Sequence, residues 1–401
     1  MKNQAQSKLA WVDHDSAARE RSLQIIGLFG ERDSRDELGL GAIRDSFSDR
    51  LFPGTSTIQT RLRYMLIIPW IFKKLEMQRI PSSEIEARAR RFELQLIKPL
   101  TESDDSLGTF GAGAGQGLKR LPSDVYWAGL GDWGIRRFGG SINDYFGSLD
   151  QIYAVRKQTH VHGDDAIEES DVLTWHPHLP DPPENFPWEL SFALTRQEAE
   201  FLCDAIVTAA GESLLGWLVR EKRRARADRP WEHPDLARFP ESIRELLQHA
   251  QLFSEVMRGA AILYNLMLAE IDSREDIVDE HRVGISDWAS KLDGRVISEW
   301  SLPDLWRVVR NPRHAIKPGA CRFVEKWVQY VGEDPHGVVD NKEARRLVQM
   351  REQALKKNRS RFVNARAREQ WSGYAGIRPM TFRWPIAQTC LEDLAHGFRR
   401  G

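Results

Sequence analysis

The stretch at residues 33–76, DSRDELGLGAIRDSFSDRLFPGTSTIQTRLRYMLIIPWIFKKLE, contains the most apolar segment of the 401-residue chain. Its pattern predicts two helices joined by a Phe-Pro-Gly turn at 52–54, and Pro69 is expected to kink the second helix or to end it early. We expect this second helix to be a central core helix, because its apolar side chains fall near one stripe. The stripe consists of Ile58, Leu62, Met65, Leu66, Phe72 and Leu75.

Helical signals recur along the rest of the chain. Residues 241–272 carry apolar side chains at helical spacing over about 30 positions, and alternating strand patterns are few. Gly259 would allow a neighbour to approach that helix closely. The fold class is therefore predicted as mainly α, a multi-helix, bundle-like protein with two helical halves. Three pairs have the spacing of a capping box: Ser34 with Glu37, Ser56 with Gln59, and Thr195 with Glu198.

Composition indicates a soluble protein of a reducing compartment. The net charge of −1 creates no global field toward nucleic acid or membrane, so any such binding depends on local patches. Three widely spaced cysteines exclude a disulfide framework and a cysteine-based zinc module. The N-terminus lacks a signal-peptide core, and the longest uncharged apolar run, at 64–72, is far below the roughly 20 residues that span a bilayer. We expect a cytoplasmic protein without membrane contact.

A change of composition near the middle of the chain suggests a boundary. Residues 158–188 turn acidic and then proline-rich, which favours an irregular surface segment. The sequence thus predicts an N-terminal helical domain at 1–156, an acidic and Pro-rich connector at 157–190, and a C-terminal helical domain at 191–401. The C-terminal domain would contain a basic helix at 342–370.

Histidine pairs within the predicted connector raise the question of a metal site. His160 and His162 form one His-x-His pair, and His176 and His178 form another. In a strand, such residues point to one side and could share a metal ion. The acidic, proline-rich surroundings favour the surface-segment interpretation, so no metal site is predicted.

Signs of catalysis are few. The chain contains no Glu-x-Lys, HxK, HExxH or GxSxG motif, and the glycine-rich stretch at 107–117 matches neither phosphate-loop pattern. His314 is an isolated candidate whose basic neighbours favour a structural or phosphate-binding role. Residues 118–141 fit a small helix-turn-helix element of a transcriptional regulator or a helical hairpin of the core. No catalytic residue and no cofactor are predicted, although distant residues can still converge in three dimensions.

The strongest electrostatic signal lies at residues 342–368, which hold ten Lys or Arg against two Glu. A basic segment followed by aromatic residues is the composition that phosphate neutralisation and base stacking require. A solvated helix face and a surface for an acidic protein partner remain the alternatives. The predicted nucleic-acid-binding residues are Arg345, Lys356, Lys357, Arg359, Arg361, Arg366, Arg368 and Trp371.

Four long motifs make the chain resemble a bacterial family classed as a domain of unknown function. They are DELGLGAIRDSFSDRLFPGTSTIQTRLRYMLIIPWIF (36–72), LKRLPSDVYWAGLGDWGI (118–135), LPDPPENFPWELSFALTRQEAEFL (179–202) and ARAREQWSGYAGIRPMTFRW (365–384). The resemblance covers nearly the whole chain. It implies association with anti-phage defence loci, beside DEAD/DEAH-type helicases and phospholipase-D-like nucleases, and it supplies no catalytic residues.

Together these observations favour a non-enzymatic subunit of a bacterial multi-protein anti-phage defence system. It would act as a scaffold or adaptor that contacts a helicase or nuclease of the same locus, and DNA through the basic segment. The alternative is a nuclease or other hydrolase of that system with an unrecognised active site.

Overall fold

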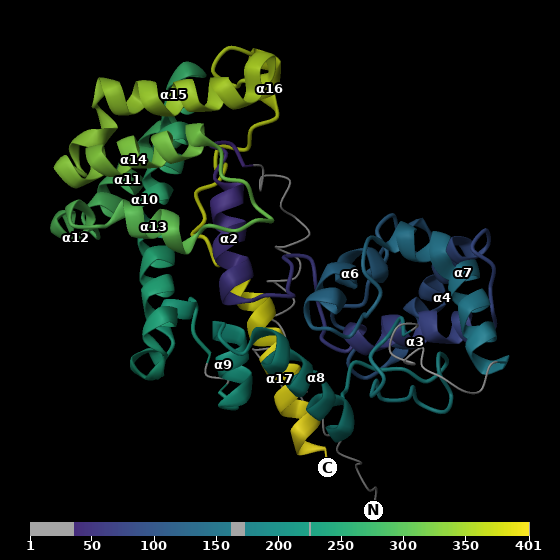
Figure 1. Cartoon of the computed structure of the whole chain (residues 1–401). Helices are drawn as coiled ribbons and strands as arrows, with labels where there is room; N and C mark the ends of the chain where they lie inside the picture. Colours follow the sequence, from purple (N-terminus) through teal and green to yellow (C-terminus); the bar gives the residue numbers. More distant parts are fainter. Residues whose placement is uncertain (1–35, 162–172, 224–225, 401) are drawn as a thin grey trace, which may run out of the picture. The chain divides into compact units, whose positions relative to one another are not determined.

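The computed structural model describes residues 36–161, 173–223 and 226–400, and residues 32–401 form one compact unit. Within the described residues the regular secondary structure is helical, and two isolated bridges, Arg136 with Trp175 and Asn311 with His314, are the only strand-like pairings. The predicted mainly α fold class is therefore confirmed (Figure 1). The apolar spacing of residues 16–30 also predicts an amphipathic helix, but these residues lie outside the described part of the chain.

The stretch that opens the sequence forms α2 (Gly41–Leu51) and α3 (Tyr64–Met77). Backbone N–H groups of Leu40 and Gly41 donate to the carboxylate of Asp36, at 2.7 and 2.6 Å, and satisfy donors at the start of α2. Helix α3 is buried along most of its length and continues through Pro69. Five side chains of the predicted stripe are buried, and Ile58 is half-buried. However, Ile58 and Leu62 precede α3, so the helix start expected from the spacing of Ser56 and Gln59 is wrong. The expectation of a core helix is confirmed.

The chain between α3 and residue 161 is built mainly from helices. Helices α4 and α6 contact α3 directly. The hydroxyl of Tyr126, on α6, donates to the carbonyl of Arg61 at 2.8 Å and accepts from the N–H of Thr60 at 2.9 Å. These elements are α4 (Ile85–Gln95), α5 (Ile97–Glu102), η1 (Gly115–Gly117), α6 (Pro122–Asp132) and α7 (Ile142–Val161).

Residues 173–194 have little regular structure, yet they pack closely on the helices. Trp175 is buried, and the indole N–H of Trp70 donates to the carbonyl of Pro180 at 2.7 Å. Phe186 meets Trp70 edge to face, with ring centroids 5.7 Å apart. The second part of the predicted connector is therefore irregular but anchored by aromatic side chains. The predicted division into domains stays a prediction.

Helix α10 (Glu241–Ile271) is a buried helix that contacts α2 and three later helices. Figure 1 shows it beside α11 (Glu275–Ala289), α14 (Pro318–Glu333) and α15 (Lys342–Lys356). Its length and apolar composition match those of a membrane span, but 89% of the relevant window is buried inside the protein. A Cβ atom on Gly259 would lie 2.1 Å from the Trp288 ring, so glycine permits the close approach of α11.

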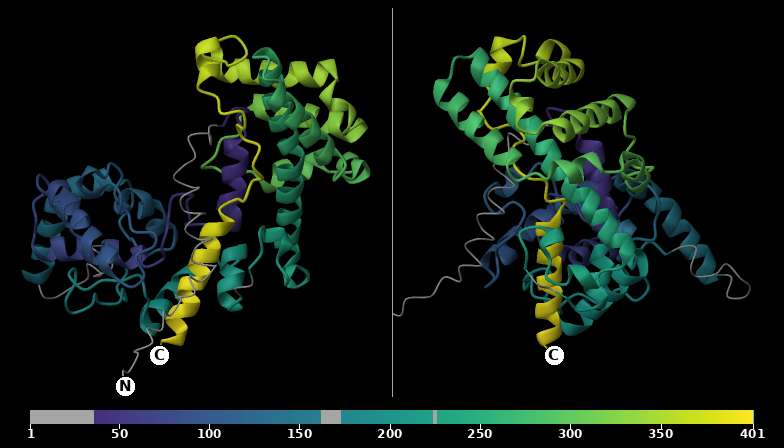
Figure 2. Two further views of the ribbon diagram at one scale, coloured as in Figure 1. Left: turned by 180° about the vertical axis from the view of Figure 1, so that it is seen from behind. Right: turned by 90° about the vertical axis from the view of Figure 1, so that its left-hand side faces the viewer.

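The C-terminal helix α17 (Trp384–Arg399) packs against α8 (Arg196–Ala210) and α9 (Leu214–Arg220), as Figure 2 shows from behind. The capping box of Thr195 and Glu198 at the start of α8 is present as predicted. One hydrophobic cluster includes buried residues from α2 to α17. The remaining elements are η3 (Pro230–Glu232), η4 (Leu236–Arg238), α12 (Gly294–Ser298), α13 (Leu302–Val308), η5 (Gly337–Val339), η6 (Lys357–Arg359) and α16 (Ala365–Glu369).

Candidate functional site

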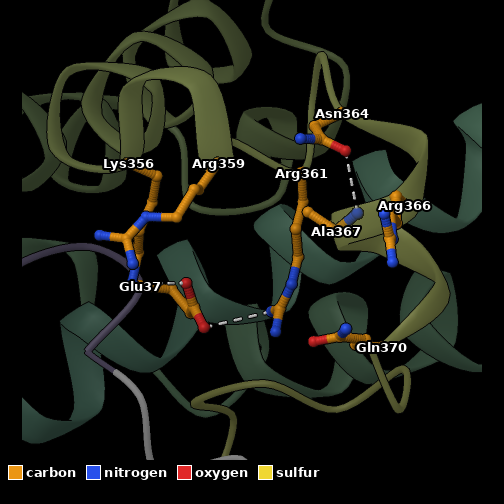
Figure 3. A pocket seen from close by; sticks show the side chains of 8 residues that line it. All are labelled: Glu37, Lys356, Arg359, Arg361, Asn364, Arg366, Ala367 and Gln370. Carbon is orange, nitrogen blue, oxygen red and sulfur yellow. Dashed lines mark hydrogen bonds and ion pairs between the residues drawn. The ribbon is translucent and has the colours of Figure 1, made fainter.

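A pocket of about 360 Å³ lies between the segment that precedes α2 and the chain that follows α15 (Figure 3). Four of its lining side chains are Lys or Arg, and one is a carboxylate. We call it the basic pocket. This excess of cations suits an anionic ligand, because charge-assisted hydrogen bonds to phosphate or carboxylate are among the strongest in proteins. The lining consists of Glu37, Lys356, Arg359, Arg361, Asn364, Arg366, Ala367 and Gln370.

The walls of the basic pocket depend on a sharp change of direction after α15. Lys357 adopts a φ of +50°, and the chain leaves the helix there. The buried carboxylate of Glu352 accepts hydrogen bonds from the Ser360 hydroxyl and from the Arg361 N–H, the latter at 2.8 Å. Asn364 then caps α16 by accepting from the N–H of Ala367 at 3.1 Å. The predicted basic helix at 342–370 is thus divided into α15, η6 and α16.

Glu37 supplies the negative charge of the basic pocket. One of its carboxylate oxygens lies 3.0 Å from Lys356 Nζ, and the other lies 3.2 Å from a guanidinium nitrogen of Arg361. The side chains of Glu37 and Arg361 are only 7% and 9% exposed, so both charges are largely removed from water. Such a buried pair depends on both partners, since an unpaired buried charge is strongly destabilising.

The segment that carries Glu37 is held in place by α15. The guanidinium of Arg351 donates to the carbonyls of Leu38 at 2.8 Å and Gly39 at 3.1 Å. Burial lowers the pKa of Arg351, although nearby Asp36 opposes the shift. Gly39 has a φ of +68°, and a Cβ atom there would lie 2.6 Å from the Arg351 side chain. Glycine is therefore required by both conformation and space.

Arg359 and Arg366 face the basic pocket and have no partner among the residues that the structure describes. Both side chains are exposed, and neither guanidinium has an ion pair or hydrogen bond within the described residues. Each could donate several hydrogen bonds in a planar, forked arrangement that matches phosphate. Lys357 is likewise exposed but does not line the pocket. These two arginines are the donors that an incoming anion would find available.

The structure brings together half of the residues predicted to bind nucleic acid. Lys356, Arg359, Arg361 and Arg366 line the basic pocket. The other four, Arg345, Lys357, Arg368 and Trp371, do not line it.

Three of those four residues make contacts within the protein. Arg345 pairs with Glu270, and Arg368 lies 2.7 Å from Asp272. The indole of Trp371 is 4% exposed, and its N–H donates to the side-chain oxygen of Asn265 at 2.8 Å. Trp371 is therefore part of the core, and base stacking on its face is not available in this conformation.

Sequence reasoning missed four polar residues that shape the basic pocket. They are Glu37, Glu352, Asn364 and Gln370. The sequence predicts a role for Glu37 only in a capping box. Spacing along the chain relates a residue to its near neighbours and not to a basic segment more than 300 positions away. The signal for Glu352 was present, since it is one of only two acidic residues in the basic run.

Two separate histidine-containing groups lie outside the basic pocket. The imidazole of His314 lies 2.9 Å from Asp49, which also pairs with Arg383 at 2.7 Å. The ring centroids of His176 and His178 are 5.6 Å apart. The backbone N–H of His178 donates to Nδ1 of His176, so this ring nitrogen already has a partner. The side chains of His160 and His162 are outside the described residues. Among the residues that are described, no group of three His, Cys, Asp or Glu could hold a metal ion.

Buried carboxylates elsewhere have protein partners for their oxygens. Glu76 accepts from Tyr145, Arg156, Thr174 and Trp175, with donor distances between 2.5 and 2.9 Å. Burial, followed by the adjacent negative charge, raises the pKa of Tyr145 well above its usual value. This group joins α3, α7 and the residues after 173, which indicates a structural role.

The glycine-rich stretch at 107–117 is anchored to the core at Phe110, although its other residues are half-buried or exposed. Phe110 is buried, and its N–H donates to the hydroxyl of Tyr64 at 3.1 Å. Trp133 follows α6 and donates its indole N–H to the carbonyl of Pro53 at 2.9 Å. Residues 118–141 contain one helix, α6, which packs against α3, so neither a helix-turn-helix element nor a two-helix hairpin is complete within them.

The fold and the basic pocket define an all-helical protein with a candidate anion site. The chain belongs to a family of unknown function, DUF6361, whose model matches residues 6–397. No curated protein and no solved structure matches the chain. The family resemblance noted from the sequence is thus confirmed at the level of a domain of unknown function.

Proposed function

We propose that this protein is a non-enzymatic, nucleic-acid-binding subunit of a bacterial multi-protein anti-phage defence system. The observation that carries the binding proposal is the basic pocket, where four cationic side chains surround a single carboxylate. Arg359 and Arg366 are exposed there without partners in the described chain. Phosphate groups are the anions that nucleic acids present, and neutralising them supplies sequence-independent affinity.

Binding measurements at two salt concentrations test the nucleic-acid proposal. Filter binding of DNA and RNA at about 50 and 200 mM salt should show affinity that falls steeply as salt rises. The double variant Arg359→Glu with Arg366→Glu should weaken binding about tenfold or more and reduce the salt slope by about 2. Neither replaced side chain has an intramolecular partner within the described residues, so the fold should be retained.

Arg346→Glu is the matched control for this experiment. Arg346 is an exposed arginine on α15 and does not line the basic pocket. Ten helical residues separate it from Lys356, a distance of about 15 Å along the axis. The control reverses the charge of one arginine, half of the change made in the double variant, and should alter affinity only about twofold. Equal losses in the control and the double variant would contradict a role for the pocket.

Membership of a defence system is supported by the family resemblance and needs a separate test. Affinity purification from the native host should recover a DEAD/DEAH-type helicase or a phospholipase-D-like nuclease from the same locus. Recovery of the protein alone would count against the adaptor role. Metal-dependent degradation of plasmid DNA by the purified chain would overturn the non-enzymatic part and favour a hydrolase.

A further inference from the structure

The basic pocket is small compared with a groove that follows a nucleic-acid strand. Its volume of about 360 Å³ is in the lower part of the range for small-molecule sites. None of its lining residues is aromatic, and Trp371 is buried. Proteins that follow a single strand stack successive bases on aromatic side chains. The basic pocket therefore has room and donors for one anionic group rather than a platform for several bases.

The charges in the basic pocket suit a doubly charged anion. Four cationic side chains line it, and only Glu37 offsets them. A phosphodiester carries a single negative charge, whereas a phosphate monoester carries about −1.5 to −2 at pH 7. Removing several cations from water around one group is favourable only where the ligand carries a comparable negative charge. The pocket thus favours a monoester over the diester linkages within a strand.

Glu37 shows how an oxyanion is held there. Its two carboxylate oxygens contact different cations, Lys356 at 3.0 Å and Arg361 at 3.2 Å. Figure 3 shows this carboxylate between Lys356 and Arg361, with Arg359 and Arg366 at the same pocket. A phosphate brings three terminal oxygens, so it could engage Arg359 and Arg366, which lack partners in the described part of the chain. It could also compete with Glu37 for Lys356 and Arg361.

We infer that the basic pocket binds a phosphate monoester, and that Glu37 is the internal carboxylate with which this ligand competes. The inference rests on the proposed function and deepens it by naming the group that is recognised. Two sources present this chemistry, the 5′-terminal phosphate of a nucleic-acid strand and a free nucleoside monophosphate. In both, the ligand would be held by hydrogen bonds and charge alone, with no bond formed or broken.

Fluorescence anisotropy with paired oligonucleotides tests the inference on the full-length protein. The probes are one single-stranded sequence with a 5′-phosphate and the same sequence with a 5′-hydroxyl, both labelled at the 3′ end. The phosphorylated strand should bind about tenfold more tightly at pH 7.5. The preference should shrink near pH 5, where the phosphate loses a charge because its second pKa is about 6. AMP added as a competitor tests whether a free nucleoside monophosphate displaces the labelled strand.

Two variants connect the preference to the basic pocket. Arg366→Glu should abolish the preference for the 5′-phosphate, whereas Arg346→Glu should preserve it. Glu37→Gln keeps the shape of the side chain but removes the competing charge, so it should increase affinity for the phosphorylated strand about threefold or more. If Glu37→Gln fails to fold because it breaks a buried ion pair, the Arg366 comparison still decides the question.

The possible outcomes separate this inference from the proposed function. Equal binding of both strands, with sensitivity to Arg366→Glu, would overturn the monoester inference and leave nucleic-acid binding intact. Binding of AMP without binding of either strand would overturn the proposed function and support the monoester inference. A lack of binding by all three probes would overturn both. Preference for the 5′-phosphate that survives Arg366→Glu would place the recognition outside the basic pocket and overturn its assignment.

Discussion

At the scale of single residues, Asn265 shows how one buried side chain fixes a loop against a helix. Its amide nitrogen donates to the carbonyls of Ala261 and Ala375, at 2.7 and 2.8 Å. Its oxygen accepts from the Trp371 indole at 2.8 Å and from the Ala375 N–H at 2.9 Å. All four contacts are buried, where an unsatisfied polar group would cost about 1–3 kcal/mol. Trp371 is thus held in the core by hydrogen bonding as well as by packing.

Glu93 provides a prediction about pH at the same scale. It is buried on α4 and accepts from the N–H and hydroxyl of Ser123, at 2.8 and 2.7 Å. Burial raises its pKa to about 7, with a further increase from Asp124, and the hydrogen bonds from Ser123 oppose the shift. The folded state therefore holds the proton more tightly than the unfolded chain, where the pKa is about 4.3. The stability linked to this proton is complete below about pH 4.3 and is lost as pH rises through 7.

The variant Glu93→Gln, which cannot ionise, should remove this part of the pH dependence. The free energy of unfolding of the unchanged protein should fall by up to about 3 kcal/mol between pH 5 and 8 relative to the variant. Urea unfolding at several pH values measures the difference. Glu86→Gln, at an exposed position of the same helix, serves as the control and should follow the unchanged protein. Parallel curves for both variants would show that Glu93 does not titrate in this range.

Local residue patterns predicted the side chains that act on their near neighbours. The capping box of Thr195 and Glu198 and the close approach at Gly259 are both present. In contrast, Ser123, the partner of Glu93, and Trp371 and Ala375, two partners of Asn265, lie 30 to 110 positions away along the chain. Spacing carries no information about such contacts, because they exist only once the helices have packed. For the same reason, the contacts of Glu37 with Lys356 and Arg361 at the basic pocket were not predictable.

At the scale of elements, the end of α15 decides the shape of the basic pocket. Lys357 has a φ of +50° and a ψ of −123°, a conformation that residues with a side chain rarely adopt. Lys357→Gly should therefore leave the free energy of unfolding unchanged or raise it by up to about 1 kcal/mol. Lys357→Val should lower it by about 1 kcal/mol or more, since a branched side chain resists this backbone geometry. Urea unfolding measures both variants, and equal effects would contradict the positive φ.

The sequence predicted helix content well but not this interruption. Residues 342–370 contain good helix formers and no glycine or proline, so propensity alone favours one continuous helix. The break follows from the contacts of Glu352 with Ser360 and Arg361, which tertiary burial makes favourable. The cations predicted along one helix face instead surround a pocket. The residue types were predictable here, but their arrangement was not.

At the scale of the molecule, Arg61 and Asp393 join α17 to the start of α3 across most of the sequence. The guanidinium of Arg61 lies 2.9 Å from Asp393 and 2.6 Å from Asp105. Asp393 also accepts from the N–H of Leu62 at 2.9 Å. Arg61 and Asp393 are only 9% and 6% exposed, whereas Asp105 is 48% exposed. Asp393 therefore pairs with Arg61 in a buried environment, whereas Asp105 pairs with the same guanidinium from a solvent-exposed position.

This difference predicts unequal effects of two otherwise identical substitutions. Asp393→Asn should lower the free energy of unfolding by about 2–3 kcal/mol, because it removes the buried negative charge that pairs with the guanidinium of Arg61. Asp105→Asn should lower it by less than about 1 kcal/mol, as expected for an exposed ion pair. Denaturant unfolding followed by tryptophan fluorescence compares them. Similar losses for both would show that water reaches the Arg61–Asp393 pair.

The position of Glu37 has a practical consequence for handling the protein. A truncation that removes the residues before α2 would retain all the arginines of the basic pocket but discard its one carboxylate and the backbone that Arg351 holds. In such a shortened chain, the cationic side chains of the basic pocket would have no carboxylate partner when they meet cellular nucleic acid after lysis. Contaminating RNA fragments would be retained through purification, and the ratio of absorbance at 260 to 280 nm would reveal them.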